Sequence, residues 1–155
     1  MYIPVCYFDS FAGQHPNVTY PMELCGVRGK DARRRAAELI EKVGLPASVL
    51  HRYPGMLSGG EQQRVAIARS IASGAHILLC DEPTGNLDTE NSSRIIDLLL
   101  DLAHQDGYCV VVVTHDPEVV ASADRVYRLV DGVLRTATYK RLGEKLNEWR
   151  KETQH

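Results

Sequence analysis

The sequence lacks the features that mark membrane-spanning, secreted and nucleic-acid-binding chains. No apolar run approaches the roughly 20 residues that a membrane helix needs. The first residues show no basic segment followed by an apolar stretch, so we expect no secretory signal peptide. The formal net charge is −2 with 25% charged residues, which argues against a chain that binds nucleic acid through an overall basic charge. We therefore expect a cytosolic protein, or one that a partner holds at a membrane.

Cysteine is also scarce, and the four cysteines form no Cys-x-x-Cys pair of the kind that binds metal or carries redox chemistry. Cys80 and Cys109 lie inside apolar, strand-like runs. This position favours buried free thiols in a reducing compartment over disulfides. With 155 residues the chain is one domain at most, and it is long enough for a hydrophobic core.

A Ser-Gly-Gly turn followed by a long helical pattern is the stretch around which the chain is organised. Ser58 precedes Gly59 and Gly60, and apolar residues then recur at helical spacing from Val65 to Ala72. Ser58 can cap this helix, and the two glycines leave the backbone N–H groups open at its start. Such a helix start can seat a phosphate. From these residues alone, a simple turn and cap is the commoner explanation.

The rest of the chain predicts alternating strands and helices. Helical spacing predicts helices over residues 31–43, 60–73, 89–105 and 117–122. Apolar runs predict strands over residues 77–80, 108–113 and 125–130, with a tight turn at 131–132. The first two runs do not alternate, which is typical of strands buried on both faces of a parallel sheet. Residues 1–23 are predicted to be irregular apart from a short strand over residues 2–8. This order of elements predicts a parallel α/β sheet.

Two of the predicted strands end in polar side chains that suit phosphate chemistry. Asp81 and Glu82 follow the first strand, and Thr114 and His115 follow the second. In parallel sheets ligands bind at the carboxyl ends of the strands, so we expect these side chains at one edge. Phosphoryl transfer needs a carboxylate for Mg²⁺ and a group that orients water. Taken singly, each pair is more often explained as a loop or helix cap, with Asp116 capping the next helix.

Four motifs in this order resemble those of the ATP-binding cassette (ABC) ATPases. They are the signature motif at 57–64, Walker B with its glutamate at 77–83, the D-loop at 84–88 and the switch-histidine segment at 110–116. The match covers roughly residues 17 to 135. The chain is identified as a member of this family, most similar to the branch of macrolide and antimicrobial-peptide exporters, lipoprotein-release ATPases and the cell-division ATPase.

The resemblance implies an α/β fold with the parallel sheet of a P-loop NTPase and a helical signature subdomain. Residues 1–135 are then a partial ABC ATPase domain, and residues 136–155 a charged C-terminal helix. Within that domain we expect the helical subdomain at about 17–75 and the α/β core at 76–135. The arginine run at 33–35 is read either as a solvated helix face or as a surface that docks on membrane subunits.

The resemblance also implies ATP and Mg²⁺ as cofactors and assigns roles to single residues. Asp81 holds the metal, Glu82 orients or deprotonates the attacking water, and His115 contacts the γ-phosphate. The D-loop contributes Asp88. The signature residues complete the nucleotide site of a second subunit in trans; they are Ser58, Gly59, Gly60 and Gln63.

One part of the family pattern is missing from these 155 residues. No Gly-x-x-x-x-Gly-Lys-[Ser/Thr] is present, and the Gly-Lys pair at 29–30 has the wrong spacing. The slot for the family's metal-contacting glutamine falls near Val5 or Cys6, and Gln14 comes too late for it. The chain therefore resembles the C-terminal two-thirds of a nucleotide-binding domain. We expect uncovered apolar surface, an open strand edge and a tendency to associate.

The function implied is that of a hydrolase, the ATP-binding subunit that couples ATP hydrolysis to transport through a membrane permease. Its partners would be a second nucleotide-binding subunit and transmembrane permease subunits, with no nucleic acid. It would lie in the cytoplasm, peripheral on the inner face of the cell membrane through the permease. The alternative is a truncated, non-catalytic domain that only donates its signature motif. A DNA-repair ATPase is disfavoured because the chain has no coiled-coil insertion and no basic excess.

Overall fold

The computed structural model describes residues 14–137, although the side chains of residues 14, 15 and 137 are not described. Its elements are α1 (Gln14–Leu24), α2 (Gly29–Lys42), η1 (Ala47–His51), η2 (Pro54–Met56), α3 (Gly59–Ile71), β1 (Ile77–Asp81), α4 (Thr89–His104), β2 (Cys109–Val113), α5 (Pro117–Ser122), β3 (Val126–Val130) and β4 (Val133–Ala137). The chain divides after residue 113 into two compact units. The predicted strand at 2–8 and residues 138–155 of the predicted C-terminal helix lie outside the described residues.

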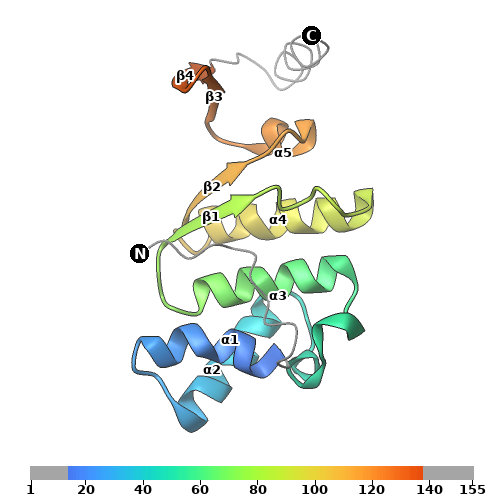
Figure 1. Ribbon diagram of the computed structural model, residues 1–155, viewed down its shortest axis with the longest axis vertical. Coiled ribbons are helices and arrows are strands. Elements are labelled where there is room, and N and C mark those ends of the chain that lie inside the picture. The colour runs from blue at the N-terminus through green and yellow to red at the C-terminus, as the bar shows by residue number, and fades with distance from the viewer. Residues whose placement is uncertain (1–13, 138–155) are drawn as a thin grey trace. The chain divides into compact units, whose positions relative to one another are not determined.

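Helix α3 is the central element of the first unit. It packs on α1 and α2 on one side and on α4 on the other, and Figure 1 shows it between the α1–α2 pair and the β1–β2 strands. Its buried apolar side chains are Val65, Ala66, Ile67, Ala68 and Ile71. The sequence pattern predicted most of this face but not Ile67, which is fully buried. One helix thus presents apolar side chains to neighbours on two sides.

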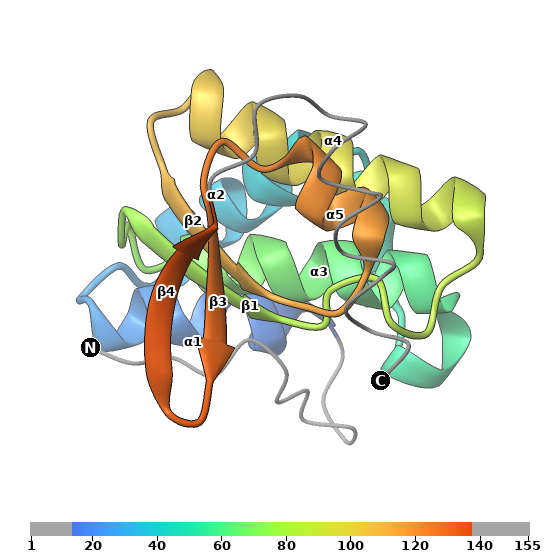
Figure 2. The same cartoon turned by 90° about the horizontal axis from the view of Figure 1, so that it is seen from above.

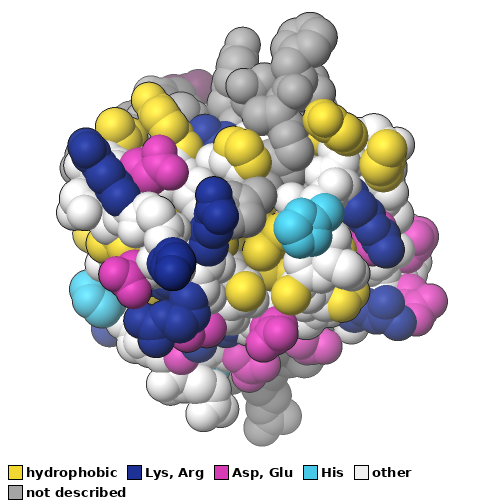
Figure 3. Space-filling model, turned by 90° about the horizontal axis from the view of Figure 1, so that it is seen from below, with side chains coloured by type: hydrophobic (Ala, Val, Ile, Leu, Met, Phe, Trp, Pro, Cys, Tyr) yellow, Lys and Arg dark blue, Asp and Glu magenta, His cyan; other side chains and the backbone are white. Residues whose placement is uncertain are grey.

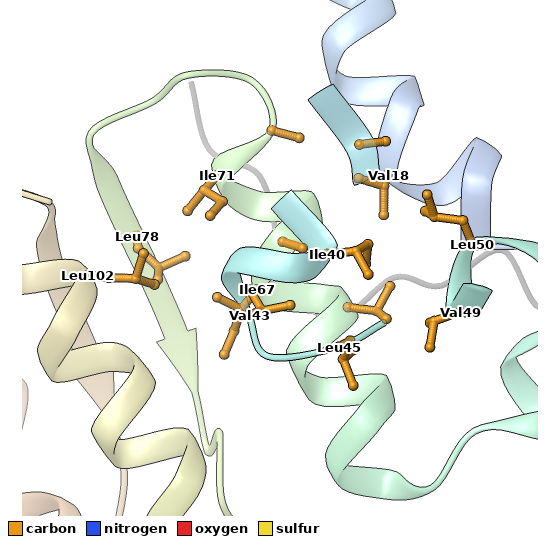
Figure 4. Packing of buried hydrophobic residues seen from close by; sticks show 14 of the residues in the cluster. Val18, Ile40, Val43, Leu45, Val49, Leu50, Ile67, Ile71, Leu78 and Leu102 are labelled. Atoms are coloured by element: carbon orange, nitrogen blue, oxygen red, sulfur yellow. The ribbon is translucent and has the colours of Figure 1, made fainter. Parts of the chain in front are cut away.

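A single cluster of buried apolar residues joins the helices to the first strand. Figure 4 shows Val18 of α1, Ile40 of α2 and Ile67 of α3 within this cluster. It also shows Leu78 of β1 and Leu102 of α4 pointing toward one another. Burying an aliphatic side chain of this size stabilises a fold by about 1.5–3 kcal/mol. The cluster therefore holds the segment before the sheet and the sheet itself in one packed body.

Helix α1 was not predicted, and the expectation that residues 9–21 are irregular is wrong for the part from residue 14 onward. Pro21 lies inside the helix and Pro16 near its start, which is why the sequence looked like a series of turns. The helix forms because Val18 and Met22, one turn apart, are fully buried against the rest of the unit. Here tertiary packing outweighs a low local helix propensity.

The other helical predictions for this unit are confirmed within one or two residues. Helix α2 buries Ala32, Ala36 and Ile40 at helical spacing and ends where Gly44 adopts a left-handed φ of 73°. The short 3₁₀ helix η1 follows Pro46. Helix α4 begins and ends close to its predicted limits, and its apolar face packs against the cluster.

Strands β1 and β2 pair in parallel, with Ile77 opposite Cys109 and Asp81 opposite Val113. The parallel pairing was predicted, but burial on both faces was not correct. Only alternate residues of β1 are buried, and the opposite face exposes apolar side chains on both strands. These exposed residues are Ile77, Leu79, Val111 and Val113. The expectation of uncovered apolar surface is thereby confirmed.

The two strand cysteines also differ from each other. Cys80 lies on the covered face of β1 and is buried, as the sequence indicated. Cys109 lies on the open face of β2 and is exposed, so its predicted burial is wrong. The alternation of a strand places successive residues on opposite faces, and only one face of this pair is covered by described residues.

The second unit consists, in its described part, of α5 and an antiparallel hairpin. Strand β3 pairs with β4 from Val126 opposite Ala137 to Val130 opposite Val133, and Figure 2 shows the pair as a separate two-stranded ribbon. The turn is made by Asp131 and Gly132, both with positive φ. The expectation that β3 continues the parallel sheet is not met, since β1 pairs only with β2 among the described strands. Between residues 14 and 137 the structure contains no helix that is long and apolar enough to cross a membrane.

Candidate functional site

The signature turn is fixed by a reciprocal pair of hydrogen bonds at the start of α3. The Ser58 hydroxyl accepts a bond from the Glu61 backbone N–H at 3.3 Å, and the Glu61 carboxylate accepts one from the Ser58 backbone N–H at 2.9 Å. This is a capping box, which satisfies two backbone donors at once. The bond from the Ser58 N–H holds the pKa of the Glu61 carboxyl below its ordinary value. The predicted cap at Ser58 is therefore confirmed.

A second side chain holds the segment just before the turn, and no sequence pattern singled it out. The Gln62 Nε2 donates to the backbone oxygens of Pro54 and Leu57, at 3.1 Å each. It thereby ties η2 to the first turn of α3. Gln63, which was expected to contact nucleotide, is half-buried and its predicted role stays a prediction.

The two glycines of the turn lie against the start of α4 and the loop that leads into it. Gly60 is buried, and a Cβ placed on it would lie 2.7 Å from the Asn91 Oδ1 atom. A Cβ on Gly59 would lie 3.3 Å from the Leu87 side chain. Real Cβ atoms do not approach other atoms as closely as 2.7 Å, so a side chain at position 60 would force Asn91 to shift. The structure thus brings the signature turn and the predicted D-loop together.

Asp88 is the N-cap of α4, and its carboxylate is held on both oxygens. The Asn91 backbone N–H donates to Oδ1 and the Asn91 side-chain Nδ2 donates to Oδ2, both at 2.8 Å. These bonds stabilise the charged form and lower the pKa of Asp88 below its ordinary value. Asn91 therefore touches both the D-loop carboxylate and the signature turn, and it was not identified from the sequence.

The end of β1 carries a strained residue at the predicted catalytic position. Glu82 has a φ of 44°, in the left-handed region that residues with a Cβ rarely adopt. Its backbone N–H donates to the Val113 carbonyl at 2.9 Å, which extends the β1–β2 ladder by one residue. Asp81 is exposed just before it, and Pro83 is fully buried just after it. A bend of this kind at a strand end is typical of functional sites.

The polar end of the switch-histidine segment, residues 114–116, belongs to the second unit. Asp116 accepts a hydrogen bond from the Glu118 backbone N–H at 2.9 Å and caps α5, as the simpler interpretation expected. The Asp116 backbone N–H donates to the Thr114 hydroxyl at 3.0 Å. His115 lies between these residues with an exposed side chain. Because Glu82 and His115 lie in different units, their approach to one another stays a prediction.

The carboxylate at the end of β1 suits a magnesium ion that is held mainly by nucleotide. Mg²⁺ prefers oxygen ligands and is commonly bound by one or two carboxylates together with phosphates and water. Asp81 offers one exposed carboxylate of this kind. Among the described residues no group of three or more His, Cys, Asp or Glu side chains is placed to hold a metal by itself. This donor set fits an ion that arrives with ATP.

Two other features lie away from these residues. The side chain of Arg34 in α2 is exposed and forms ion pairs at 3.8 Å with Asp31 and Glu38 of the same helix. Figure 3, viewed from the side of α1 and α2, shows basic side chains with acidic ones among them, which suits a solvated face.

A pocket of about 220 Å³ lies between α1 and α2, lined by Tyr20, Glu23 and Arg33 among others. None of its lining residues belongs to the predicted site.

A comparison with protein families decides the identity. The family described as ABC transporter matches residues 5–85, which include the signature turn and the end of β1. The chain belongs to the ABC transporter family. The identification made from the four motifs is therefore confirmed.

Individual relatives of this ABC protein agree. An uncharacterised ABC transporter ATP-binding protein of Mycobacterium tuberculosis, Rv0986, is 47% identical over 76% of this chain and 47% of its own length. The lipoprotein-releasing system ATP-binding protein LolD 1 of Rhodospirillum rubrum is 46% identical over 75% of this chain and 51% of its own length. The chain thus spans about half the length of the curated relatives it matches.

Solved structures confirm the fold class. The ATP-binding cassette MJ0796, in a dimeric post-hydrolysis state bound to ADP and Pi, matches with a TM-score of 0.71 and 35% identity. The match covers 84% of this chain and 59% of that one. An inward-facing transporter of putative metal-chelate type matches with a TM-score of 0.78 and 28% identity over 87% of this chain and 56% of that one. The α/β fold with a parallel pair and a helical signature subdomain is that of an ABC ATPase.

Proposed function

We propose that this chain is the ATP-binding part of an ABC transporter subunit, in which ATP hydrolysis drives transport through a membrane permease. The backbone of Glu82 is the observation that carries the proposal. A left-handed φ at a residue with a Cβ costs about 1–2 kcal/mol, and such strain persists where function requires the geometry. A carboxylate that merely capped a helix would not need it. The hydrogen bond to Val113 holds the bend in place.

The roles of the side chains follow from the chemistry of phosphoryl transfer. Glu82 would orient or deprotonate the water that attacks the γ-phosphate, and His115 would contact the same phosphate. Asp81 would hold Mg²⁺, which neutralises the charge of the phosphates when it is bound. The bend at Glu82 turns the chain sharply at the carboxyl end of β1, where ligands of parallel sheets bind.

The signature turn would act on a nucleotide held by a second subunit. Ser58, Gly59 and Gly60 open α3 with a hydroxyl and free N–H groups, an arrangement that binds anions. Gln63 and Asp88 would take part at the same interface. The dimeric state of the MJ0796 cassette supports this pairing. The lipoprotein-releasing relatives support a place on the inner face of the membrane, attached through permease subunits.

The first test measures ATP hydrolysis by the purified chain in the presence of Mg²⁺, beside Glu82→Gln. Loss of a general base lowers turnover by about 10²–10⁴-fold, so the variant is expected to be inactive. Glu38→Gln is the matched control, because Glu38 is an exposed carboxylate on α2 outside the predicted site. Its turnover is expected to equal that of the unmodified chain.

A second arm adds a P-loop-bearing cassette of the same family whose own signature serine has been replaced by arginine. Hydrolysis in this mixture requires the signature turn of the present chain, and Ser58→Ala is expected to weaken it. Turnover by the chain alone that disappears in Glu82→Gln supports the full proposal. Turnover only in the mixture supports the donor of a signature motif instead. No turnover in either arm overturns the proposed function.

A further inference from the structure

The contact between the signature turn and the D-loop runs through one side chain. The space beside Gly60 is filled by Asn91, since a Cβ there would lie 2.7 Å from Oδ1 and 2.9 Å from Cγ of that residue. The same side chain donates from Nδ2 to the Asp88 carboxylate at 2.8 Å. Asn91 is therefore held by a carboxylate on one side and packs against bare backbone on the other.

Capping alone does not explain this side chain. The backbone N–H of Asn91 already donates to the Asp88 Oδ1 atom, which satisfies the N-cap of α4. The Nδ2 bond and the packing on Gly60 are additional, and both come from the side chain. A side chain fixed at both ends transmits a displacement of one partner to the other.

We propose that Asn91 is a positioning residue that fixes the D-loop carboxylate of Asp88 to the start of the signature helix at Gly60. The two segments then approach a nucleotide as one rigid edge. The contact itself is independent of ATP, whereas its role in hydrolysis rests on the proposed function. The variant Asn91→Ala isolates it, because the backbone bond of the cap is kept and only the side chain is removed.

The contact is tested by two-dimensional NMR of the full chain during a titration of Asp88. The Gly60 amide resonance is expected to follow the Asp88 carboxyl titration in the parent and to stop following it in Asn91→Ala. Both proteins carry Glu61→Gln, because the Glu61 carboxylate bonds to Ser58 and would titrate nearby. Glutamine keeps the capping box. A Gly60 resonance that ignores Asp88 in the parent overturns the proposal.

The other charged groups near the contact are the same in both proteins. They include Arg52, which pairs with Glu61 in the unmodified chain, Arg64 on α3, and the pair formed by Glu90 and Arg94 on α4. Ser93→Ala serves as the matched control, since Ser93 is exposed on the same helix two residues further along. In this control the Gly60 resonance is expected to follow Asp88 as in the parent.

A double-mutant cycle tests the packing by a different measurement. Gly60→Ala is expected to lower the urea midpoint of unfolding, because the added methyl group meets Asn91. In the Asn91→Ala background the same substitution is expected to cost clearly less, since the space is then free. Losses that simply add in the double variant overturn the contact.

The role in hydrolysis is measured in the mixture with the cassette that lacks its own signature serine. Asn91→Ala is expected to lower turnover by up to about 10²-fold, as misplacement of a positioned group by about 1 Å can, and Ser93→Ala to leave it unchanged. Unchanged turnover in Asn91→Ala overturns the positioning role even if the contact is present. If the unmodified chain gives no turnover, the proposed function has failed, and the NMR titration and the cycle still decide the contact.

Discussion

At the scale of single residues, the site combines strain with tight hydrogen bonding. Glu82 has a positive φ that suits a glycine, whereas Ser58 and Asp88 keep ordinary capping geometry through hydrogen bonds to Glu61 and Asn91. Preorganised sites show both features: backbone strain at a reacting group and rigid hydrogen bonding in the groups around it. Each has a consequence that can be measured on the free chain.

The strain at Glu82 predicts that Glu82→Gly is more stable than Glu82→Ala, although both substitutions abolish turnover. Glu82→Gly and Glu82→Ala both remove the carboxylate, but only glycine removes the penalty of a positive φ. We expect Glu82→Gly to have a free energy of unfolding about 1 kcal/mol higher than Glu82→Ala, with turnover lost in both. Urea denaturation of the two variants measures the difference. Equal stabilities would show that the bend stores no strain.

The lowered pKa values of Glu61 and Asp88 predict how stability depends on pH. A carboxyl with a lower pKa in the folded state binds fewer protons there than when unfolded, so it stabilises the fold above its unfolded pKa. This contribution is complete above roughly pH 4–5 and is lost as the pH falls through the folded pKa values. Thermal unfolding between pH 6 and pH 3 should show a smaller loss for Glu61→Gln than for the unmodified chain. An equal loss in both proteins would exclude a contribution from Glu61.

At the scale of elements, α3 predicts the largest effects on stability because it packs on two sides. Ile67 is fully buried within the cluster, so Ile67→Ala is expected to cost about 2–5 kcal/mol. Leu24→Ala is the matched control, because Leu24 at the end of α1 is 61% exposed and should cost little. Chemical denaturation of both variants compares them. Similar losses would mean that α3 is not the centre of the packed cluster.

The same scale shows what the sequence could and could not predict. Helices α2, α3 and α4 were found because their apolar residues recur at helical spacing and their ends carry caps or glycines. Helix α1 was missed because Pro21 argues against a helix, and only the burial of Val18 and Met22 against other segments explains it. Burial on both faces of β1 was wrongly predicted, since an unalternating apolar run does not reveal which face is covered.

For the site, motif order located the residues but not their contacts. The cap at Ser58 follows from a local pattern and is confirmed, whereas the cap at Asp88 and the bend at Glu82 are seen only in the structure. Gly60 and Asn91 are 31 positions apart in the sequence, and no local sequence pattern predicts their contact. Packing between α3 and α4 creates that contact, so it emerges only from the folded chain.

At the scale of the whole molecule, the open face of the β1–β2 pair predicts association. Val111 and Val113 are 43% and 64% exposed on a face of four large apolar side chains. Apolar surface of this kind favours contact with other molecules. We expect the sedimentation coefficient of the purified chain to rise with concentration, and Val111→Thr with Val113→Thr to keep it monomeric.

The control for this experiment lies one residue away. Val110 is on the covered face of β2 and packs against the cluster, so Val110→Thr should reduce stability without reducing association. A sharp, reversible unfolding transition of a strictly monomeric chain would contradict the prediction that this face drives association.

The pairing of β1 with β2 also makes hydrogen-bonded amides alternate with amides that face away from the partner strand. The Cys109 backbone N–H donates to the His76 carbonyl, and the Glu82 backbone N–H donates to the Val113 carbonyl. The even-numbered residues of β1 therefore direct their N–H and C=O groups toward β2. Ile77 and Leu79 direct theirs the other way, because successive residues of a strand point their amides to opposite sides. Hydrogen–deuterium exchange along β1 should therefore alternate residue by residue, slow at Leu78 and fast at its neighbours. If another strand binds to the side of β1 that faces away from β2, exchange should become slow at every residue and the alternation should disappear.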